Sequence, residues 1–149
     1  MNLELDYTIH LENLTEPGKE PVENASDMDL RYYYFPGNIT LRQGKVDLSA
    51  KWGWIPIFDF ALALKDICKS LQTTGEEVFE FTESDATLSF RYDQGKVLIA
   101  ASYANGEITV NYAEFEDQVG KFYSRLVNDM LLRSPGLERN VFFTSLDTL

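Results

Sequence analysis

The sequence has few of the residue types that build metal and nucleophilic sites. Its 149 residues include one cysteine, Cys68, and one histidine, His10. A single cysteine excludes an intrachain disulfide and a zinc site built on several cysteines. The sequence also lacks a glycine-rich phosphate loop and a Gly-x-Ser-x-Gly motif. Carboxylate pairs arise by chance among 24 acids, so we expect no enzymatic activity, no catalytic residues, no metal site and no cofactor.

Basic residues are also scarce, because 13 Lys and Arg stand against 24 Asp and Glu for a net charge of −11. Nucleic-acid phosphates attract clustered bases, which makes DNA and RNA poor candidate ligands. Residues 1–29 hold eight acids and one base, and residues 76–117 hold ten acids and two bases. These segments predict contacts with a basic partner, although a solvated acidic face that keeps the protein soluble is the alternative.

Long apolar runs are absent, since no uninterrupted stretch approaches the ~18 residues of a membrane span. The first residues, 1–6, lack the basic and apolar regions of a secretory signal. We therefore expect a cytoplasmic protein with no membrane partner. The composition, 44% hydrophobic and 25% charged, is typical of globular chains and predicts one domain over 1–149 with a long acidic loop at about 13–29.

Hydrophobic periodicity predicts an α+β fold, in which two amphipathic helices pack on an antiparallel β-sheet of about six to seven strands. We expect turns at Gln43-Gly44, at 93–95 and at Asn105-Gly106. The expected strands are 3–11, two or three in all over 30–35 and 38–50, then 78–82, 87–92, 96–103 and 108–112, and the tail is a candidate for a short one at 141–143. The expected helices are about 56–72 and 115–133.

Two stripes of apolar residues mark the expected helices. The first contains Ile57, Ala61, Leu64, Cys68 and Leu71, and the second contains Phe115, Val119, Phe122, Leu126 and Met130. The place of Cys68 on the first stripe favours a small buried side chain over a nucleophile. His10 is in phase with the polar side of the first strand, which favours a surface histidine over a general base.

Aromatic residues are plentiful, at 13% of the chain. The run 32–35 cannot direct all its rings to one face of a strand, and Trp52 and Trp54 flank Gly53. Tyrosine and tryptophan are typical anchors of protein interfaces, so Tyr33, Trp52 and Trp54 are candidate anchors. The alternative is that these rings pack beneath the long acidic loop.

One stretch of the chain resembles a family of bacterial proteins. It contains the apolar helix that follows Trp54-Ile55-Pro56, the strand Glu77-Val78-Phe79-Glu80-Phe81-Thr82, a meander, and a closing helix with Phe115 and Phe122. This order, over residues 54–133, resembles small immunity proteins of polymorphic-toxin and contact-dependent growth inhibition systems. The resemblance implies a cytoplasmic protein that binds a cognate toxin and neutralises it. Such families diverge with their toxins, so no contact residue is carried over.

The predicted mechanism is occlusion, in which an acidic surface covers the basic active-site cleft of a nuclease toxin. The candidate rim residues are Asp27, Asp29, Glu76, Glu77, Glu80 and Glu83, around the anchors Tyr33, Trp52 and Trp54. A secretion chaperone is the second interpretation, and it would hold an extended effector segment while the effector stays active. A small-ligand-binding domain is the third, and its ligand would raise the melting temperature.

Overall fold

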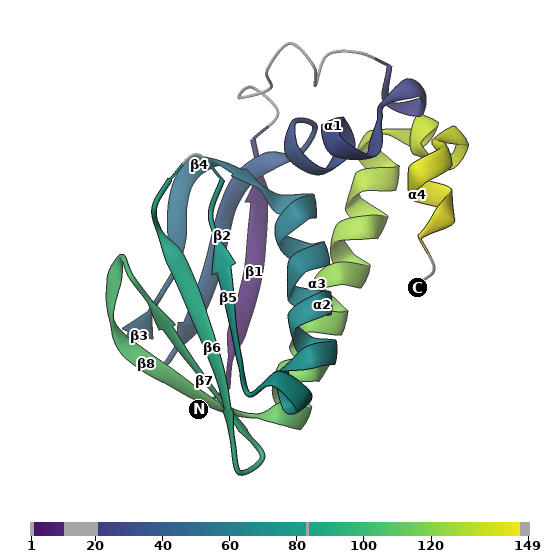
Figure 1. Ribbon diagram of the computed structural model, residues 1–149. Helices are drawn as coiled ribbons and strands as arrows, with labels where there is room; N and C mark the ends of the chain where they lie inside the picture. Colours follow the sequence, from purple (N-terminus) through teal and green to yellow (C-terminus); the bar gives the residue numbers. More distant parts are fainter. Residues whose placement is uncertain (1, 11–20, 83, 147–149) are drawn as a thin grey trace.

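Strands and helices follow one another in the computed structural model in an order typical of the α+β class (Figure 1). The structure describes residues 2–10, 21–82 and 84–146. The predicted fold class is confirmed. The elements are β1 (Glu4–Ile9), η3 (Val22–Asn24), α1 (Asp27–Tyr32), β2 (Pro36–Gln43), β3 (Val46–Asp47), β4 (Ala50–Pro56), α2 (Ile57–Thr74), β5 (Glu76–Glu80), β6 (Thr87–Asp93), β7 (Lys96–Ala101), β8 (Ala104–Asn111), α3 (Tyr112–Arg133), η4 (Pro135–Arg139) and α4 (Val141–Ser145).

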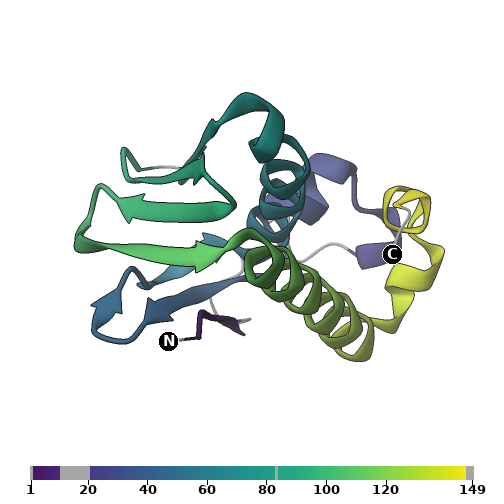
Figure 2. The ribbon, with the colours of Figure 1, turned by 90° about the horizontal axis from the view of Figure 1, so that it is seen from below.

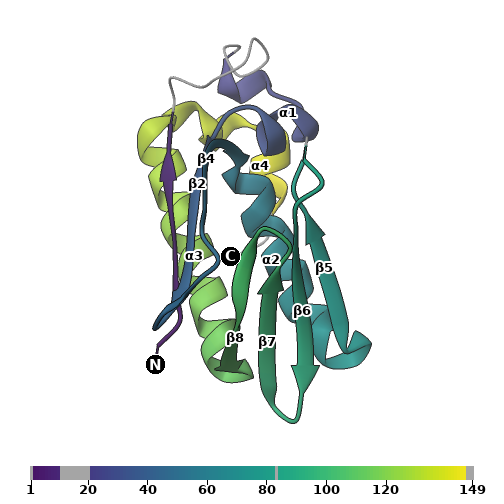
Figure 3. The ribbon, with the colours of Figure 1, turned by 90° about the vertical axis from the view of Figure 1, so that its left-hand side faces the viewer.

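The described strands divide between two antiparallel four-stranded sheets rather than forming one (Figure 3). In the first sheet, β2 pairs with β1 along one edge and with β3 and β4 along the other. The second sheet is the meander β5-β6-β7-β8. The side-chain amide of Gln43 donates to the Thr109 carbonyl (2.7 Å) and accepts from the Thr109 N–H (3.1 Å). The end of β2 is therefore bonded to the free edge of β8, and this contact joins the two sheets.

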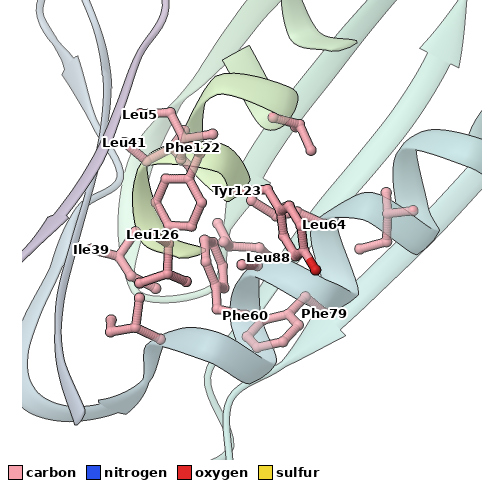
Figure 4. Packing of buried hydrophobic residues seen from close by; sticks show 14 of the residues in the cluster. Leu5, Ile39, Leu41, Phe60, Leu64, Phe79, Leu88, Phe122, Tyr123 and Leu126 are labelled. Carbon is pink, nitrogen blue, oxygen red and sulfur yellow. The ribbon is translucent and has the colours of Figure 1, made fainter. Parts of the chain in front are cut away.

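Helices α2 and α3 cover the inner faces of both sheets, and Figure 2 shows them on one side with the strands on the other. Every residue of the two predicted apolar stripes is buried, which confirms both helices. Side chains from β1, β2, β5, β6 and the two helices meet in one core (Figure 4). Phe60 lies at its centre, with its ring 5.1 Å from that of Phe79 and 5.9 Å from that of Phe122.

The segment before β2 is helical, although the sequence predicts a strand over 30–35 and a loop at about 13–29. Residues 13–20 of that loop lie outside the described residues, and η3 and α1 occupy most of the remainder. The Ser26 hydroxyl caps α1 by accepting from the Asp29 N–H (3.1 Å). Two acids in the first turn favour the same helix through its dipole. Local capping therefore outweighs the strand preference of the tyrosines.

The tail is also helical, although the sequence predicts a strand at 141–143. The Asn140 side chain caps α4 by accepting from the Phe143 N–H (2.9 Å). Its amide group donates to the carbonyls of Val22 (2.7 Å) and Ala25 (3.0 Å). Asn140 is fully buried, so these bonds satisfy its polar atoms and attach the tail to η3. This long-range contact cannot be read from the apolar run alone.

The hairpin between β7 and β8 turns at Ser102-Tyr103, three residues before the predicted Asn105-Gly106 turn. Ala100 pairs with Glu107 and Ala101 with Ala104, so Asn105 and Gly106 form a bulge inside β8. Gly106 has φ +97°, a conformation that glycine tolerates in bulges as readily as in turns. The Asn-Gly pair therefore correctly indicates a residue with positive φ, but the prediction that the hairpin turns there is wrong.

Candidate partner-binding surface

Strand β4 contains a bulge that carries both tryptophans of the chain. Gly37 pairs with Ile55 and Ile39 with Ala50. The four residues 51–54 of β4 therefore lie opposite a single residue of β2, Asn38. Gly53, in the middle of this excess, has φ +80°, where a residue with a Cβ would be strained by about 1–2 kcal/mol. The sequence Trp-Gly-Trp thus supplies a glycine where the strand bends and a large ring on each side of it.

The two indole rings stack on each other and remain accessible. Their centroids are 5.4 Å apart with an interplanar angle of 20°, and each tryptophan is 36% exposed. Trp52 also makes edge contacts with the rings of Phe81 and Tyr103, each at 5.1 Å. Phe81 follows β5, and Tyr103 lies in the turn between β7 and β8. Trp52 therefore lies at the junction of the two sheets. We call Trp52 and Trp54 the tryptophan pair.

Buried aromatic rings support the tryptophan pair from within. Phe81 lies 4.9 Å from Phe79 and 6.3 Å from Phe60, centroid to centroid, and all three are buried. Aromatic contacts of this kind contribute about 0.5–1.5 kcal/mol each beyond the burial of area. The tryptophan pair is therefore the exposed end of a stack that reaches the centre of the core.

Tyr103 ties the same region to the first sheet. Its hydroxyl donates to the carbonyl of Leu48 (2.7 Å), between β3 and β4. Burial, with a smaller effect from the Asp47 carboxylate, raises the pKa of Tyr103 well above its usual value. The hydroxyl stays protonated and remains a donor. This bond fixes the turn between β7 and β8 against the strand that carries the tryptophans.

The structure separates the predicted acids of β5 into two groups. Glu76 and Glu80 are exposed on the outer face, on either side of the exposed Val78. Glu80 lies next to Phe81, which contacts Trp52, whereas Glu76 begins the strand at its opposite end. Glu80 is therefore at the end of β5 that leads to Phe81, and Glu76 is at the other end.

Glu77 is not a free rim residue, which corrects the prediction. Its side chain turns toward α2, where its carboxylate accepts from Ser70 Oγ (2.9 Å) and Thr74 Oγ1 (2.7 Å). The alternation of β5 explains this, because Glu77 shares the inner face with the buried Phe79. Glu83 lies outside the described residues. Asp85, between β5 and β6, is exposed.

The candidate residues of α1 form a separate group at the end of the molecule. Asp27 is exposed and accepts from the Met28 N–H (2.8 Å), while Asp29 is half-buried in the first turn. Tyr33 is half-buried and ends the helix by donating its N–H to the Asp29 carbonyl (2.9 Å). The bonds of these residues form α1 and its caps, so we do not place them at the tryptophan pair.

Sequence reasoning missed the ion pair that holds α1 in place. The Arg31 guanidinium donates through Nη2 (2.6 Å) and Nε (2.9 Å) to Asp59 Oδ1, and Asp59 is 7% exposed in the first turn of α2. The residues are 28 apart in the chain, so no local spacing indicates the pair. It fixes the position of α1 against α2.

The expected burial of Cys68 is confirmed, and His10 lies on the polar side expected of it. His10 is half-buried on the polar side of the chain after β1, and Asn38 lies 3.0 Å from its Nε2 atom. Cys68 is buried in α2, and burial raises the pKa of its thiol. Within the described ranges, no group of three or more His, Cys, Asp and Glu side chains is placed to hold a metal ion.

Hollows on the helical side are open. One of about 340 Å³ lies between α3 and α4 and is mainly apolar, with Tyr123, Val127 and Phe143 in its lining. A neighbouring hollow of about 300 Å³ has Arg31 and Lys69 in its wall. None of the helices in the described part of the chain has the length and apolar character needed to cross a membrane.

Comparisons of the chain with protein-family models, curated proteins and solved structures find no match. A function therefore has to be argued from the residues of this chain. The feature that combines exposed aromatic area with rigid support is the tryptophan pair, and Glu80 and Asp85 are exposed on either side of Phe81 in the sequence, the residue that contacts Trp52.

Proposed function

We propose that this protein is a cytoplasmic immunity protein, which binds a basic bacterial toxin domain through the tryptophan pair and neutralises it by covering its active-site cleft. The observation that carries the proposal is the stacked tryptophan pair, each ring 36% exposed on the bulge of β4. Tryptophan is enriched among the residues that contribute most to protein interfaces, where truncation costs about 2 kcal/mol or more.

The support beneath the tryptophan pair favours a role in binding. Trp52 is held by Phe81 and Tyr103, and Tyr103 is itself bonded to Leu48. A side chain that is already fixed loses little conformational freedom when a partner binds, and each mobile side chain would cost about 0.5–1.5 kcal/mol to order. The pair is thus preorganised as an anchor.

The charge of the chain supplies the second part of the proposal. Glu80 and Asp85 are exposed at the end of β5 and in the segment after it, and the whole chain carries −11. A basic cleft is attracted to such a surface over roughly the Debye length of 8–10 Å, and the attraction acts mainly on the association rate. Of the predicted rim acids, Glu80 is the exposed one next to Phe81, and Asp85 is an exposed acid in addition to that set.

The first experiment expresses this protein together with the C-terminal domain of the large reading frame beside its gene. Rescue of growth from a toxic domain, with recovery of an inactive complex, supports neutralisation. A harmless domain, or toxicity that persists, overturns the proposal. A complex in which the toxin keeps its activity points instead to the secretion chaperone.

The second experiment measures binding of that domain to variants. Trp52→Ala and Trp54→Ala should each weaken binding at least tenfold, mostly through faster dissociation. Leu132→Ala is the matched control, because Leu132 is an 82% exposed hydrophobic residue on α3. Unchanged affinity in both tryptophan variants would remove the anchors from the proposal.

The third experiment tests the charges. Glu80→Lys and Asp85→Lys together should slow association at low salt, and the difference should shrink near 1 M salt, where the Debye length is about 3 Å. Two similar charge reversals on α3, Glu116→Lys and Asp117→Lys, serve as the control, since both residues are exposed there. Equal slowing in both double variants would show that only net charge matters.

A further inference from the structure

We propose that Asn38 positions the tryptophan pair, and that protonation of His10 releases it. The proposal deepens the proposed function, because it names what sets the geometry of the same surface. Its test uses the protein alone, however, so the two proposals can fail independently. It starts from a chain of hydrogen bonds that links His10, Asn38 and Gly53 across three strands.

The Gly53 N–H determines how the Asn38 side chain is oriented. It donates to Asn38 Oδ1 (2.7 Å). A backbone N–H can only donate, so the carbonyl oxygen of the Asn38 amide must face Gly53 and its NH₂ group must face the other way. That NH₂ lies 3.0 Å from His10 Nε2. His10 Nε2 therefore accepts, which requires a neutral imidazole with its proton on Nδ1.

The bond from Gly53 acts directly on the tryptophans. Its donor is the amide of the Trp52–Gly53 peptide bond, at the centre of the β4 bulge. Asn38 lies on β2 between the paired residues Gly37 and Ile39, opposite the excess length of β4. The Asn38 side chain thus bonds a peptide group within the bulge and fixes the peptide plane between the two indole rings.

Protonation of His10 is incompatible with this arrangement. Nε2 then carries a hydrogen and faces the NH₂ of Asn38, so two donors oppose each other. If the Asn38 amide turns over, its oxygen accepts from His10, but its NH₂ then faces the Gly53 N–H. Either way one bond of the chain is lost. The Thr8 hydroxyl, 3.3 Å from Nε2, can serve either form of the ring and does not remove the conflict.

Other charged groups on this face belong to all three strands. Among the described residues they are Glu4 and Asp6 on β1, Arg42 on β2 and Lys51 on β4, and Lys51 donates to Thr40 Oγ1. None of these residue types ordinarily titrates between pH 5 and 8, whereas histidine does. His10 is the chain's only histidine, so replacing it decides whether a transition in this range belongs to it.

The test is a pH titration of tryptophan fluorescence, because the chain has only the two tryptophans of the pair. From pH 8 to pH 5, wild-type emission should move to longer wavelength and acrylamide quenching should increase. Loss of one hydrogen bond shifts the equilibrium of the bulge about fivefold, equivalent to about 1 kcal/mol. Partner binding, once a partner is available, should weaken by a similar factor.

Three variants separate the effect of this chain of hydrogen bonds from a general effect of acid. His10→Gln keeps an acceptor that does not titrate, so its emission should stay constant over this range. His10→Lys presents a permanent donor, so at pH 8 its emission should resemble the acid spectrum of the wild type. Asn38→Asp keeps an acceptor for Gly53 and offers a second oxygen to His10, which can donate from Nε2 in its neutral Nε2–H tautomer as well as when protonated, so its emission should change little with pH. Far-UV circular dichroism checks that each variant is folded.

A wild-type emission that stays constant from pH 8 to pH 5 overturns the proposal. A transition that persists unchanged in His10→Gln overturns it as well, because that transition would belong to another group. These results leave the binding of a toxin domain at pH 8 untouched. Conversely, a protein that binds no toxin can still show the pH-dependent shift of tryptophan emission.

Discussion

Replacing Trp52 by alanine should destabilise the free protein as well as weaken partner binding. Trp52 is 36% exposed, so about two thirds of a ring of roughly 250 Å² is covered, or about 160 Å². At about 25 cal/mol per Å² this area contributes about 4 kcal/mol. The β-carbon that remains and the collapse of an open surface site reduce the expected loss to about 2–3 kcal/mol.

The measurement is urea unfolding followed by far-UV circular dichroism, together with a thermal melt. For a chain of this length 1 kcal/mol corresponds to about 2–4 °C, so the melting temperature should fall by about 5–10 °C. Trp54→Ala should cost less, because Trp54 stacks on Trp52 while Trp52 also contacts Phe81 and Tyr103. Leu132→Ala, at an 82% exposed position, should stay within about 0.5 kcal/mol.

A loss below about 1 kcal/mol in Trp52→Ala would refute the reasoning, because it would show that the ring contacts at the junction of the sheets contribute little. The result would also weaken the argument that the tryptophan pair is preorganised for binding. An equal loss in Trp54→Ala would mean that the stack, and not its contacts to the second sheet, carries the stability.

Three further predictions concern contacts away from the tryptophan rings. Tyr103→Phe leaves the Leu48 carbonyl without its donor, so urea unfolding should show a loss of about 1–3 kcal/mol. Arg31→Ala leaves the buried Asp59 unpaired and should cost up to about 3–5 kcal/mol, whereas Arg31→Met with Asp59→Leu should recover most of that loss in a double-mutant cycle. Burial and the contact with the Cys68 side chain raise the pKa of Tyr112 to about 12 from an ordinary value of about 10. Its contribution is complete below about pH 10 and is lost as the pH rises toward about 12, so Tyr112→Phe should make the alkaline fall in unfolding free energy shallower.

The sequence by itself determined the elements whose signals are local. The stripe from Ile57 to Leu71 repeats at helical spacing, so only one face can be buried and the segment must be a helix. The turn at 93–95 follows in the same way from a glycine between alternating runs. The alternation of β5 also indicates that Glu77 points inward, because Phe79, two residues later on the same face, packs in the core.

The tertiary structure alone decided that the tail is helical. The apolar run at 141–143 has no helical period of its own, and it becomes helical because buried Asn140 caps it while bonding to Val22 and Ala25. The junction between the two sheets depends in the same way on Gln43 meeting Thr109, 66 residues away. Contacts between residues so far apart in the chain produce no local pattern in the sequence from which they could be predicted.

The candidate surface combines both kinds of information. Trp52-Gly53-Trp54 is visible in the sequence as two interface residues around a flexible one. Their exposure, however, depends on the register slip between β2 and β4, and their rigidity depends on Phe81 and Tyr103, which the fold brings from distant strands. Local periodicity therefore specifies which residues form helices and strands, while the packing of the two sheets determines which of them can meet a partner.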